Sequence, residues 1–453
     1  MGRSAVRSAE RENGTPRYTI AMQRFDLDGP DSLAALRVAF ARANAGETAE
    51  TEKVVSEILA DVKARGDEAV LERTRQFDAP DARSLVVPPV AIAGAVNRVK
   101  ATPLWGALEL ARERIQAFHA RQVRQSWLDD SRPGEILGQR IVPLTRVGVY
   151  VPGGRAAYPS TVLMAGVPAR VAGVRELVMA TPPSRDTGLP PDATLAAASL
   201  AGFDTVYAMG GAQAIGALAY GTESVGAVEK IVGPGNIYAN LAKKQVFGAV
   251  GIDMLAGPSE VAVLFDASAK PEDIALETIC QIEHDPQNRA LLVTDSPEAL
   301  EAALAEIERQ LSDLPRSETV RGSLTRSFGV VAADLSLAVE AVNAFGPEHL
   351  HVLTAEPWGI LGSIQSAGAI LLGPHSRAAL GDYVLGPSHT LPTAGCARYA
   401  SPLNVDDFTK KQSVIWIGAD AAARLAPAAE ILATFEGLEG HARSARGKSG
   451  RAG

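Results

Sequence analysis

The residues best suited to chemistry lie late in the chain, since six of its seven histidines follow residue 280. Gln281 and His284 stand three residues apart in QIEHDP, so a helix through this stretch presents an amide and an imidazole on one face. The apolar residues of the stretch, Leu276 among them, are expected on the other side. The helix should end at Asp285-Pro286, because a residue before proline avoids the helical region. Such a helix end can form half of a metal site, although alone it is also an ordinary polar helix end.

Three later stretches supply further candidates. Glu348 and His349 are adjacent in GPEHL, Asp382 stands in GDYVLGPSH, and Glu436 and His441 stand in EGLEGHA. An imidazole titrates near neutral pH and a partly desolvated glutamate can be raised toward it, so the adjacent pair could divide proton transfers. A Glu-His dipeptide taken alone is usually surface decoration.

Two histidines, one glutamine and one aspartate offer nitrogen and oxygen donors, a set that suits Zn²⁺ and would also admit Mn²⁺ or Co²⁺. The sequence has no Cys-x-x-Cys and no His-Glu-x-x-His pattern, which argues against the simplest structural-zinc and zincin sites. His389 can equally be a ligand or a structural histidine bonded to backbone. We predict no functional role for the remaining histidines, His119, His351 and His375.

Composition and charge are those of an ordinary soluble globular protein. The chain has 453 residues, of which 46% are hydrophobic and 21% charged, enough for two or three domains. Its net charge of −8 argues against nucleic acid or an anionic membrane as the main partner. Its two cysteines suit a reducing compartment, and no uninterrupted apolar run is long enough to span a membrane. Residues 1–21 lack a secretory apolar segment, so we expect a flexible leader, with Met22 as an alternative start.

The elements that must position these residues alternate between strand and helix. Strands are expected at 141–151, 177–180, 205–209, 230–232, 260–265, 290–294, 329–332 and 369–372, with helices between most of them. Helical periodicity also runs through 48–77 and 102–123. This alternation predicts α/β architecture with parallel sheets that helices cover on both faces.

Four glycine-containing loops lie next to predicted strands. They are Pro152-Gly153-Gly154, Gly210-Gly211, Gly233-Pro234-Gly235 and Gly257-Pro258-Ser259. Ligands of open parallel sheets bind beyond the carboxyl ends of strands, and glycine lets a backbone approach them closely. Any one loop can be an ordinary turn, but four in one region predict a ligand crevice. The standard dinucleotide fingerprint GxGxxG is absent.

Taken together, these stretches resemble the histidinol dehydrogenase family. The matching runs come in the family's order from about residue 140 to 445 and include VGVYVPGGRAAYPSTVLM, MGGAQAIGALAYGTESV, KIVGPGNIYANLAKKQV, DMLAGPSEVAVL, QIEHDP, GPEHL, GDYVLGPSHTLPT and FEGLEGHARS. The resemblance implies two incomplete Rossmann-like domains with mostly parallel sheets, as in aldehyde dehydrogenases. It also implies a cytoplasmic NAD-dependent homodimer, with one Zn²⁺ per subunit, that oxidises L-histidinol through histidinal to L-histidine. This reaction ends histidine biosynthesis and consumes two NAD⁺.

The resemblance also assigns a role to each candidate by its position in the family's motifs. Glu348 and His349 would be the proton acceptors. The zinc ligands would be Gln281, His284, Asp382 and His441. Tyr150, Gln213 and Asn236 would contact NAD. Substrate would be bound by Ser259, Glu436, His349 and the four zinc ligands.

The expected domain division follows from the resemblance and the element pattern. It comprises the leader 1–21, a dimerisation segment 22–47, a first Rossmann-like domain of 48–149 with 260–403 that carries the metal and catalytic residues, a second on the NAD side at 150–259, a tail 404–445 packed on the partner subunit, and a disordered end 446–453. His441 and Glu436 lie in that tail, so the active site would be shared between subunits.

Three classes of function stay open at this point: a zinc- and NAD-dependent four-electron dehydrogenase, a metallohydrolase with Glu348 as base, and a metal-stabilised assembly protein.

Two stretches depart from the usual family pattern. Ser388 stands in GPSH where GPNH is frequent, and Gly373 to Arg377 replaces a Thr-Pro-Glu-like run. A related enzyme that oxidises another small polar alcohol, such as a sulfonated diol, to its acid therefore remains an alternative. Glu436 favours histidinol, because a carboxylate suits the substrate's ammonium group.

Overall fold

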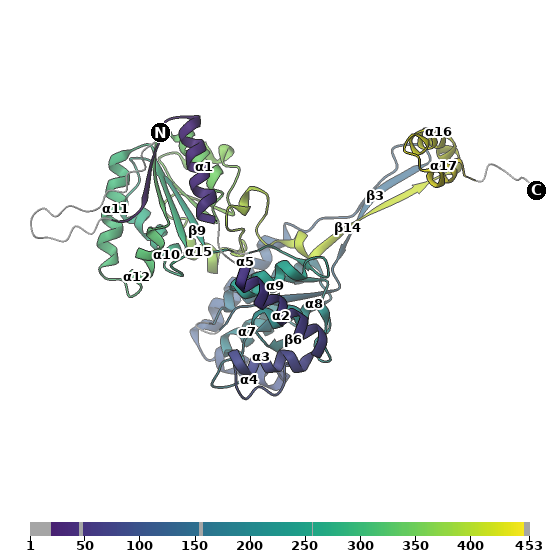
Figure 1. Ribbon diagram of the computed structural model, residues 1–453, viewed down its shortest axis with the longest axis horizontal. Coiled ribbons are helices and arrows are strands. Elements are labelled where there is room, and N and C mark those ends of the chain that lie inside the picture. Colours follow the sequence, from purple (N-terminus) through teal and green to yellow (C-terminus); the bar gives the residue numbers. More distant parts are fainter. Residues whose placement is uncertain (1–19, 45–48, 154–156, 256, 448–453) are drawn as a thin grey trace, which may run out of the picture.

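Two lobes and a projecting arm make up the chain in the computed structural model (Figure 1). The structure describes residues 20–44, 49–153, 157–255 and 257–447. The predictions for the leader and for the last residues lie almost wholly outside these ranges. Within them, no helix is both long enough and apolar enough to cross a lipid bilayer.

The first lobe is built on a five-stranded parallel sheet with the strand order β6-β5-β4-β7-β8. Its strands are β4 (Arg146–Tyr150), β5 (Glu176–Thr181), β6 (Thr205–Ala208), β7 (Lys230–Val232) and β8 (Gly251–Ile252). The helices α6 (Pro159–Ala172), α7 (Asp192–Ala201), α8 (Gly211–Tyr220) and α9 (Ile237–Val246) alternate with them. The strand order reverses between β4 and β7, which is where open α/β sheets bind ligands.

Four earlier helices cover this same sheet, which corrects the predicted domain division. They are α2 (Ala49–Arg65), α3 (Asp67–Phe77), α4 (Pro89–Lys100) and α5 (Pro103–Ala120). The helices α4 and α5 share one buried apolar cluster with α6, α7 and β4, and α2 and α3 share another with α8 and α9. Assigning residues 48–149 to the metal-carrying domain was therefore wrong, because their apolar faces are buried on the other sheet.

Two predicted elements are interrupted. The helix expected over 48–77 breaks at Gly66, whose φ of +58° favours glycine, and a Cβ there would meet the Glu223 carboxylate at 2.3 Å. The strand expected over 141–151 is two strands, β3 (Glu135–Pro143) and β4, that belong to different sheets. The alternating apolar pattern continues from β3 into β4, so it does not show where one strand ends and the next begins.

The second lobe holds a six-stranded parallel sheet with the order β1-β11-β10-β9-β12-β13. Its strands are β1 (Gln23–Leu27), β9 (Glu260–Phe265), β10 (Arg289–Thr294), β11 (Phe328–Ala332), β12 (His349–Leu353) and β13 (Ala369–Leu372). The helices and short turns of this lobe are α1 (Pro30–Asn44), α10 (Pro271–Ile282), α11 (Pro297–Leu311), α12 (Ser317–Leu324), α13 (Leu335–Phe345), α14 (Pro357–Ile360), η1 (Leu361–Ser363), α15 (Ala378–Tyr383) and η2 (Cys396–Arg398). The two sheets confirm the predicted α/β class with mostly parallel strands.

The described part of the segment predicted for dimerisation, 22–44, is an integral part of this lobe. The strand β1 pairs with β11 from Gln23 opposite Phe328 to Leu27 opposite Ala332. Phe40 of α1 packs edge-on against Phe328, with ring centroids 4.9 Å apart. The chain therefore closes this sheet with its own N-terminal strand.

The arm is an antiparallel ribbon that leaves the lobes (Figure 1). The strand β14 (Thr409–Ile417) follows η3 (Val405–Phe408) and pairs with β3 along its whole length, and β2 (Trp127–Asp129) adds to the other edge of β3. At the far end lie α16 (Ala419–Phe435) and α17 (Glu439–Arg446). The predicted tail therefore shares its ribbon with residues that were assigned to the first domain.

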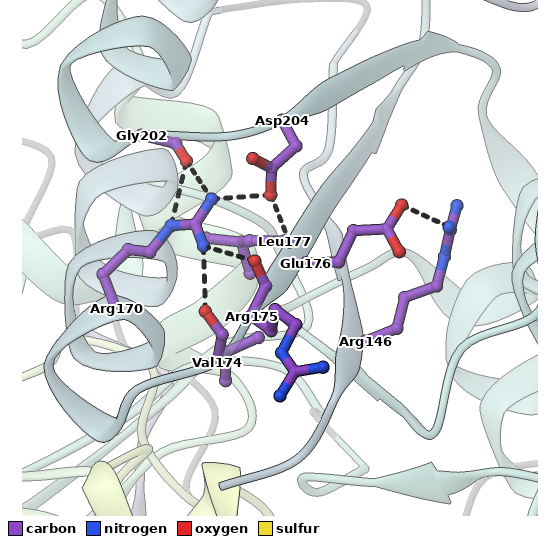
Figure 2. Close-up of polar contacts among 8 residues, drawn as sticks. All are labelled: Arg146, Arg170, Val174, Arg175, Glu176, Leu177, Gly202 and Asp204. Carbon is purple, nitrogen blue, oxygen red and sulfur yellow. Dashed lines mark hydrogen bonds and ion pairs between the residues drawn. The ribbon is translucent and has the colours of Figure 1, made fainter.

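Arg170 anchors the amino-end edge of the five-stranded sheet (Figure 2). Its guanidinium donates to the carbonyl oxygen of Val174 at 2.8 Å and to that of Gly202 at 3.0 Å. It also donates to the Asp204 carboxylate at 2.6 Å, which accepts from the Leu177 N–H at 2.8 Å. The Arg170 side chain thus donates hydrogen bonds to carbonyl oxygens at the ends of two helices. The glycine loops lie at the opposite edge of the sheet.

Candidate active site

The candidate catalytic residues gather at the amino ends of strands in the six-stranded lobe. Glu260 opens β9 and lies opposite Arg289, the first residue of β10. His349 opens β12 and lies opposite Val261, so Glu348 lies beside Glu260. The strand β12 was not predicted, but its start gives the pair Glu348-His349 access to one edge of the sheet.

Backbone and side-chain donors fix Glu348. It is 8% exposed, and its Oε2 accepts the Glu260 N–H at 3.1 Å. Burial raises its pKa, and the neighbouring His349 only partly opposes this. The Ser259 side chain also hydrogen-bonds to it. A buried carboxylate of this kind can accept a proton at a pH nearer neutrality than an exposed one.

Behind Glu348 lies a second buried carboxylate, which sequence reasoning missed. Glu260 pairs with Arg289 at 2.6 Å and accepts the Gly395 N–H at 3.2 Å. Burial nevertheless raises the pKa of Glu260 to about 7. In the sequence, Glu260 could have been noticed as the only charged residue of the apolar strand EVAVLF, which it opens.

His349 is oriented by Asp382. The His349 Nε2 lies 3.3 Å from Asp382 Oδ1, and the imidazole is 5% exposed. Burial disfavours the imidazolium, but Asp382 and Glu348 outweigh it and raise the pKa of His349. Within the described parts of the chain, His349 Nδ1 has no hydrogen-bond partner. The ring is thus held by one nitrogen, while the other is free to accept a proton.

Two of the predicted metal ligands meet between α10 and α15. Gln281 is 3% exposed, and its amide lies against the Asp382 carboxylate. Burial opposes ionisation of Asp382, but His349, His389 and Gln281 together lower its pKa. The carbonyl oxygen of the Gln281 amide and the Asp382 carboxylate are both oxygen donors, so the pair has the chemistry to share a cation.

His284 follows the end of α10 and is exposed, with its carbonyl oxygen accepting from Arg316 Nη2 at 3.0 Å. It therefore shares a helix end with Gln281, as predicted. The apolar face of α10 is buried as expected except for Leu276, which is 49% exposed, while Glu277 and Gln281 on the polar face are buried as well. In the described ranges no group of three or more His, Cys, Asp or Glu side chains could hold a metal.

The remaining predicted ligands lie far from this lobe within one chain. His441 is in α17 and Glu436 caps α16, both exposed at the tip of the arm. Figure 1 shows this tip well separated from α10 and α15. One chain alone therefore does not bring His441 and Glu436 to the other site residues.

The predicted cofactor residues lie at the carboxyl edge of the five-stranded sheet, as the glycine loops indicated. Tyr150 ends β4, and its hydroxyl accepts the Gly211 N–H at 3.1 Å. Burial raises the pKa of Tyr150 to about 12. Gln213 is buried in α8, and the Asn236 side chain caps α9 by accepting the Ala239 N–H at 3.1 Å. These three residues therefore shape the loops of the switch point.

A buried ion pair that sequence reasoning missed holds the loop after β7. Lys243 and Asp253 form a salt bridge with both side chains 0% exposed. Lys243 Nζ donates to the Gly233 carbonyl oxygen at 2.9 Å, and Asp253 Oδ2 accepts the Gly233 N–H at 2.7 Å. Gly233 has a φ of +110°, a backbone conformation that favours glycine. The ion pair therefore fixes both the N–H and the carbonyl oxygen of this residue.

His389 joins the two lobes as a structural residue. Its Nδ1 lies 2.8 Å from the Asp382 carbonyl oxygen, and its Nε2 lies 3.2 Å from Thr161 Oγ1 on α6. Burial lowers its pKa. With His349, Asp382 and Ser388, it lines a cavity of about 170 Å³.

Comparison with known proteins gives a consistent result along nearly the whole chain. The family model described as histidinol dehydrogenase matches residues 41–449. A histidinol dehydrogenase of Moorella thermoacetica is 50% identical over 394 residues, covering 86% of this chain and 92% of the relative. One of Bacillus subtilis is 46% identical over 419 residues, covering 92% and 97%. The crystal structure of histidinol dehydrogenase from Elizabethkingia anophelis matches with a TM-score of 0.87 at 32% identity, covering 95% of this chain and 98% of that one.

Proposed function

This chain belongs to the histidinol dehydrogenase family, and we propose that it oxidises L-histidinol through L-histidinal to L-histidine with two NAD⁺. The observation that carries this proposal is the arrangement of Glu348, His349 and Asp382. It places a carboxylate base and an oriented imidazole side by side at the end of one strand. NAD⁺, when bound, accepts hydride, and zinc holds and polarises the substrate.

We assign His349 to the alcohol proton. Its Nδ1 has no partner within the described chain, while Asp382 holds Nε2. An imidazole positioned in this way can take the hydroxyl proton as hydride leaves the adjacent carbon. The same ring would serve the second oxidation, when the aldehyde hydrate loses its proton and hydride.

We assign Glu348 to the water that adds to the aldehyde. An aldehyde must be hydrated before it can lose a second hydride, and unactivated water is a poor nucleophile. Burial raises the pKa of Glu348, which brings it nearer to the value a general base needs. Its Oε2 accepts the Glu260 N–H, which holds the carboxylate in place.

The residues present fit a zinc site that needs two chains. Gln281, His284 and Asp382 would supply three ligands from one subunit, and His441 of a second copy the fourth. The set of imidazole, amide-oxygen and carboxylate donors suits Zn²⁺, and Gln281 and Asp382 already lie against each other. Within one chain only two of these ligands near the site, His284 and Asp382, are His, Cys, Asp or Glu, because one ligand is glutamine and another lies on the arm.

The arm supports a homodimer. Ile415 is 74% exposed, Ile431 69% and Phe435 91%, and these side chains lie on a projecting arm where they find no core of their own. Exposed apolar patches of this kind mark interaction sites. We assign this face to a second copy of the chain, where Glu436 would meet the substrate's ammonium group.

The stretch 373–377, which departs from the family pattern, does not favour a sulfonated diol as substrate. A sulfonate needs a free cation, and Arg377 is the cation that this stretch introduces. Its guanidinium pairs instead with Asp273 at 2.7 Å and with Glu277 at 3.1 Å. The departure therefore strengthens the contact between α10 and α15, and we retain histidinol as the substrate.

The decisive assay follows NADH after L-histidinol and NAD⁺ are added to the full-length protein. Two NADH per histidinol are expected, and one NADH would show that the aldehyde is released. Other amino alcohols and a sulfonated diol form the comparison panel, and a faster reaction with any of them would replace histidinol. Product formation by ester or amide cleavage without NAD⁺ would instead indicate a metallohydrolase.

A further inference from the structure

The two helices that present Gln281 and Asp382 come from distant parts of the chain, so their relative position needs a physical cause. Glu277 lies four residues before Gln281 on α10, on the same face, and it is 4% exposed. One oxygen of its carboxylate accepts the N–H of Ala378, the first residue of α15, at 3.0 Å. The other accepts from Arg377 at 3.1 Å. A single buried carboxylate thus joins α10 to the start of the helix that carries Asp382.

Arg377 extends this contact by another turn of α10. Its Nη2 donates to Asp273 Oδ1 at 2.7 Å, and Asp273 stands four residues before Glu277. The residues 273, 277 and 281 therefore form one polar stripe along α10 that faces α15. Charge-assisted hydrogen bonds of this kind are about twice as strong as neutral ones.

The third element of the site joins the same carboxylate. His351 Nε2 lies 3.3 Å from Glu277 Oε2, and His351 is 0% exposed. His351 and His349 are two residues apart on β12, so their side chains lie on the same face of the sheet. Burial and then His349 lower the pKa of His351 to about 3, so its ring is neutral. The histidine predicted to have no function thus packs between His349 and the stripe of α10.

We propose that Glu277 and Arg377 form a clasp that positions the metal ligands. The clasp fixes α15 against α10, and β12 packs against it through the neutral ring of His351, so that Gln281, Asp382 and His349 meet at one point. Arg377 comes from the stretch that departs from the usual family pattern, and in this chain it supplies the second half of the clasp. The inference rests on the proposed zinc site, but it concerns residues that do not touch the metal.

The expected effect is on metal affinity. Replacing residues that orient metal ligands typically lowers metal affinity by about 10- to 100-fold. Arg377→Met removes the guanidinium but keeps the stem of the side chain, and it should weaken Zn²⁺ binding within this range. Arg377→Lys, which keeps the charge, should recover part of the loss. Affinity for NAD⁺ should not change, because the cofactor loops lie on the other sheet.

Arg321 provides a matched control in the same lobe. Its side chain is 32% exposed, as is that of Arg377, and it pairs with Glu308 through two nitrogens at 3.0 and 2.7 Å. It joins α12 to α11, away from α15. Arg321→Met therefore loses a comparable ion pair without loosening the clasp, and its Zn²⁺ affinity should match that of the wild type.

The experiment titrates Zn²⁺ into the metal-free full-length dimer against a chromophoric chelator, and records the visible spectrum of the Co²⁺-loaded protein. A weaker Zn²⁺ affinity and an altered Co²⁺ spectrum in Arg377→Met, but not in Arg321→Met, would support the clasp. Equal affinity in wild type and Arg377→Met would overturn it, as would an equal loss in both arginine variants. Absence of tight Zn²⁺ binding by the wild type would instead refute the proposed zinc site.

Discussion

Replacing Lys243 by methionine should destabilise the five-stranded lobe and displace the loop after β7. The Lys243 and Asp253 side chains are both 0% exposed, so Lys243→Met leaves a carboxylate buried without its counter-ion. It also removes the donor to the Gly233 carbonyl oxygen. Breaking a buried ion pair by removing one partner costs about 3–5 kcal/mol. We expect a loss of unfolding free energy in this range.

A double-mutant cycle separates the pair from its surroundings. Asp253→Asn keeps an acceptor for the Gly233 N–H but leaves Lys243 charged and buried. The double variant Lys243→Met/Asp253→Asn removes both charges, so it should lose less stability than the two single losses added together, by about 1–3 kcal/mol. The reason is that an uncompensated buried charge costs more than a missing neutral contact.

The assay is urea unfolding followed by circular dichroism, together with the KM for NAD⁺. Lys244→Met serves as control, because Lys244 is 57% exposed and pairs with Glu52 at the surface, and it should change stability by at most about 0.5 kcal/mol. Lys243→Met should also raise the KM for NAD⁺. A loss no larger than that of Lys244→Met, or single losses that add within about 0.5 kcal/mol in the double variant, would refute the reasoning.

Four further predictions address the site. Glu348→Gln should slow NADH formation from histidinal by roughly 10²-fold or more but affect histidinol oxidation far less, and equal slowing in single turnovers would disprove the division of labour. Asp382→Ala should lose zinc together with activity, so full zinc content by elemental analysis would contradict its role as ligand. Mixed dimers of a His441→Ala and a His349→Asn chain should regain activity through one intact site, and inactive mixed dimers would rule out a shared site. Burial raises the pKa of Asp78 from 3.8 to about 6, so the unfolded chain loses its proton first and stability falls as pH rises through this window. Asp78→Asn should therefore be about 1–2 kcal/mol more stable than wild type at pH 7, allowing for partial exposure, with no difference near pH 4.

The succession of helices and strands in the two lobes could be predicted from the sequence, because most of these elements follow simple periodic patterns. The strands β9 and β10 are buried along their whole length, and each stands out as an apolar run. The strand β12 did not, because its first and third residues are His349 and His351. Both rings are buried against charged partners, which no rule of apolar periodicity anticipates.

Long-range packing could not be read from these patterns. Leu276 was expected on the buried face of α10 but is 49% exposed, and the polar stripe on the other face packs against α15. Helices α2 to α5 follow a strand of one sheet and precede the strands of the other, and their apolar faces do not say which sheet they cover. His441 lies in α17 at the tip of the arm, and only the three-dimensional path of the ribbon shows how far one chain carries it from Asp382.

The long ribbon has a consequence for how this chain is synthesised. Pro143 pairs with Thr409 and Glu135 with Ile417, so β3 leaves the ribosome long before its partner exists. At about 5–20 residues per second, β3 waits on the order of 10–50 s with the edge that β14 will occupy unpaired. Such an edge is a template for pairing with other chains, and neighbouring nascent chains on one messenger present the same edge to each other. Premature release before residue 409 would make that exposure permanent.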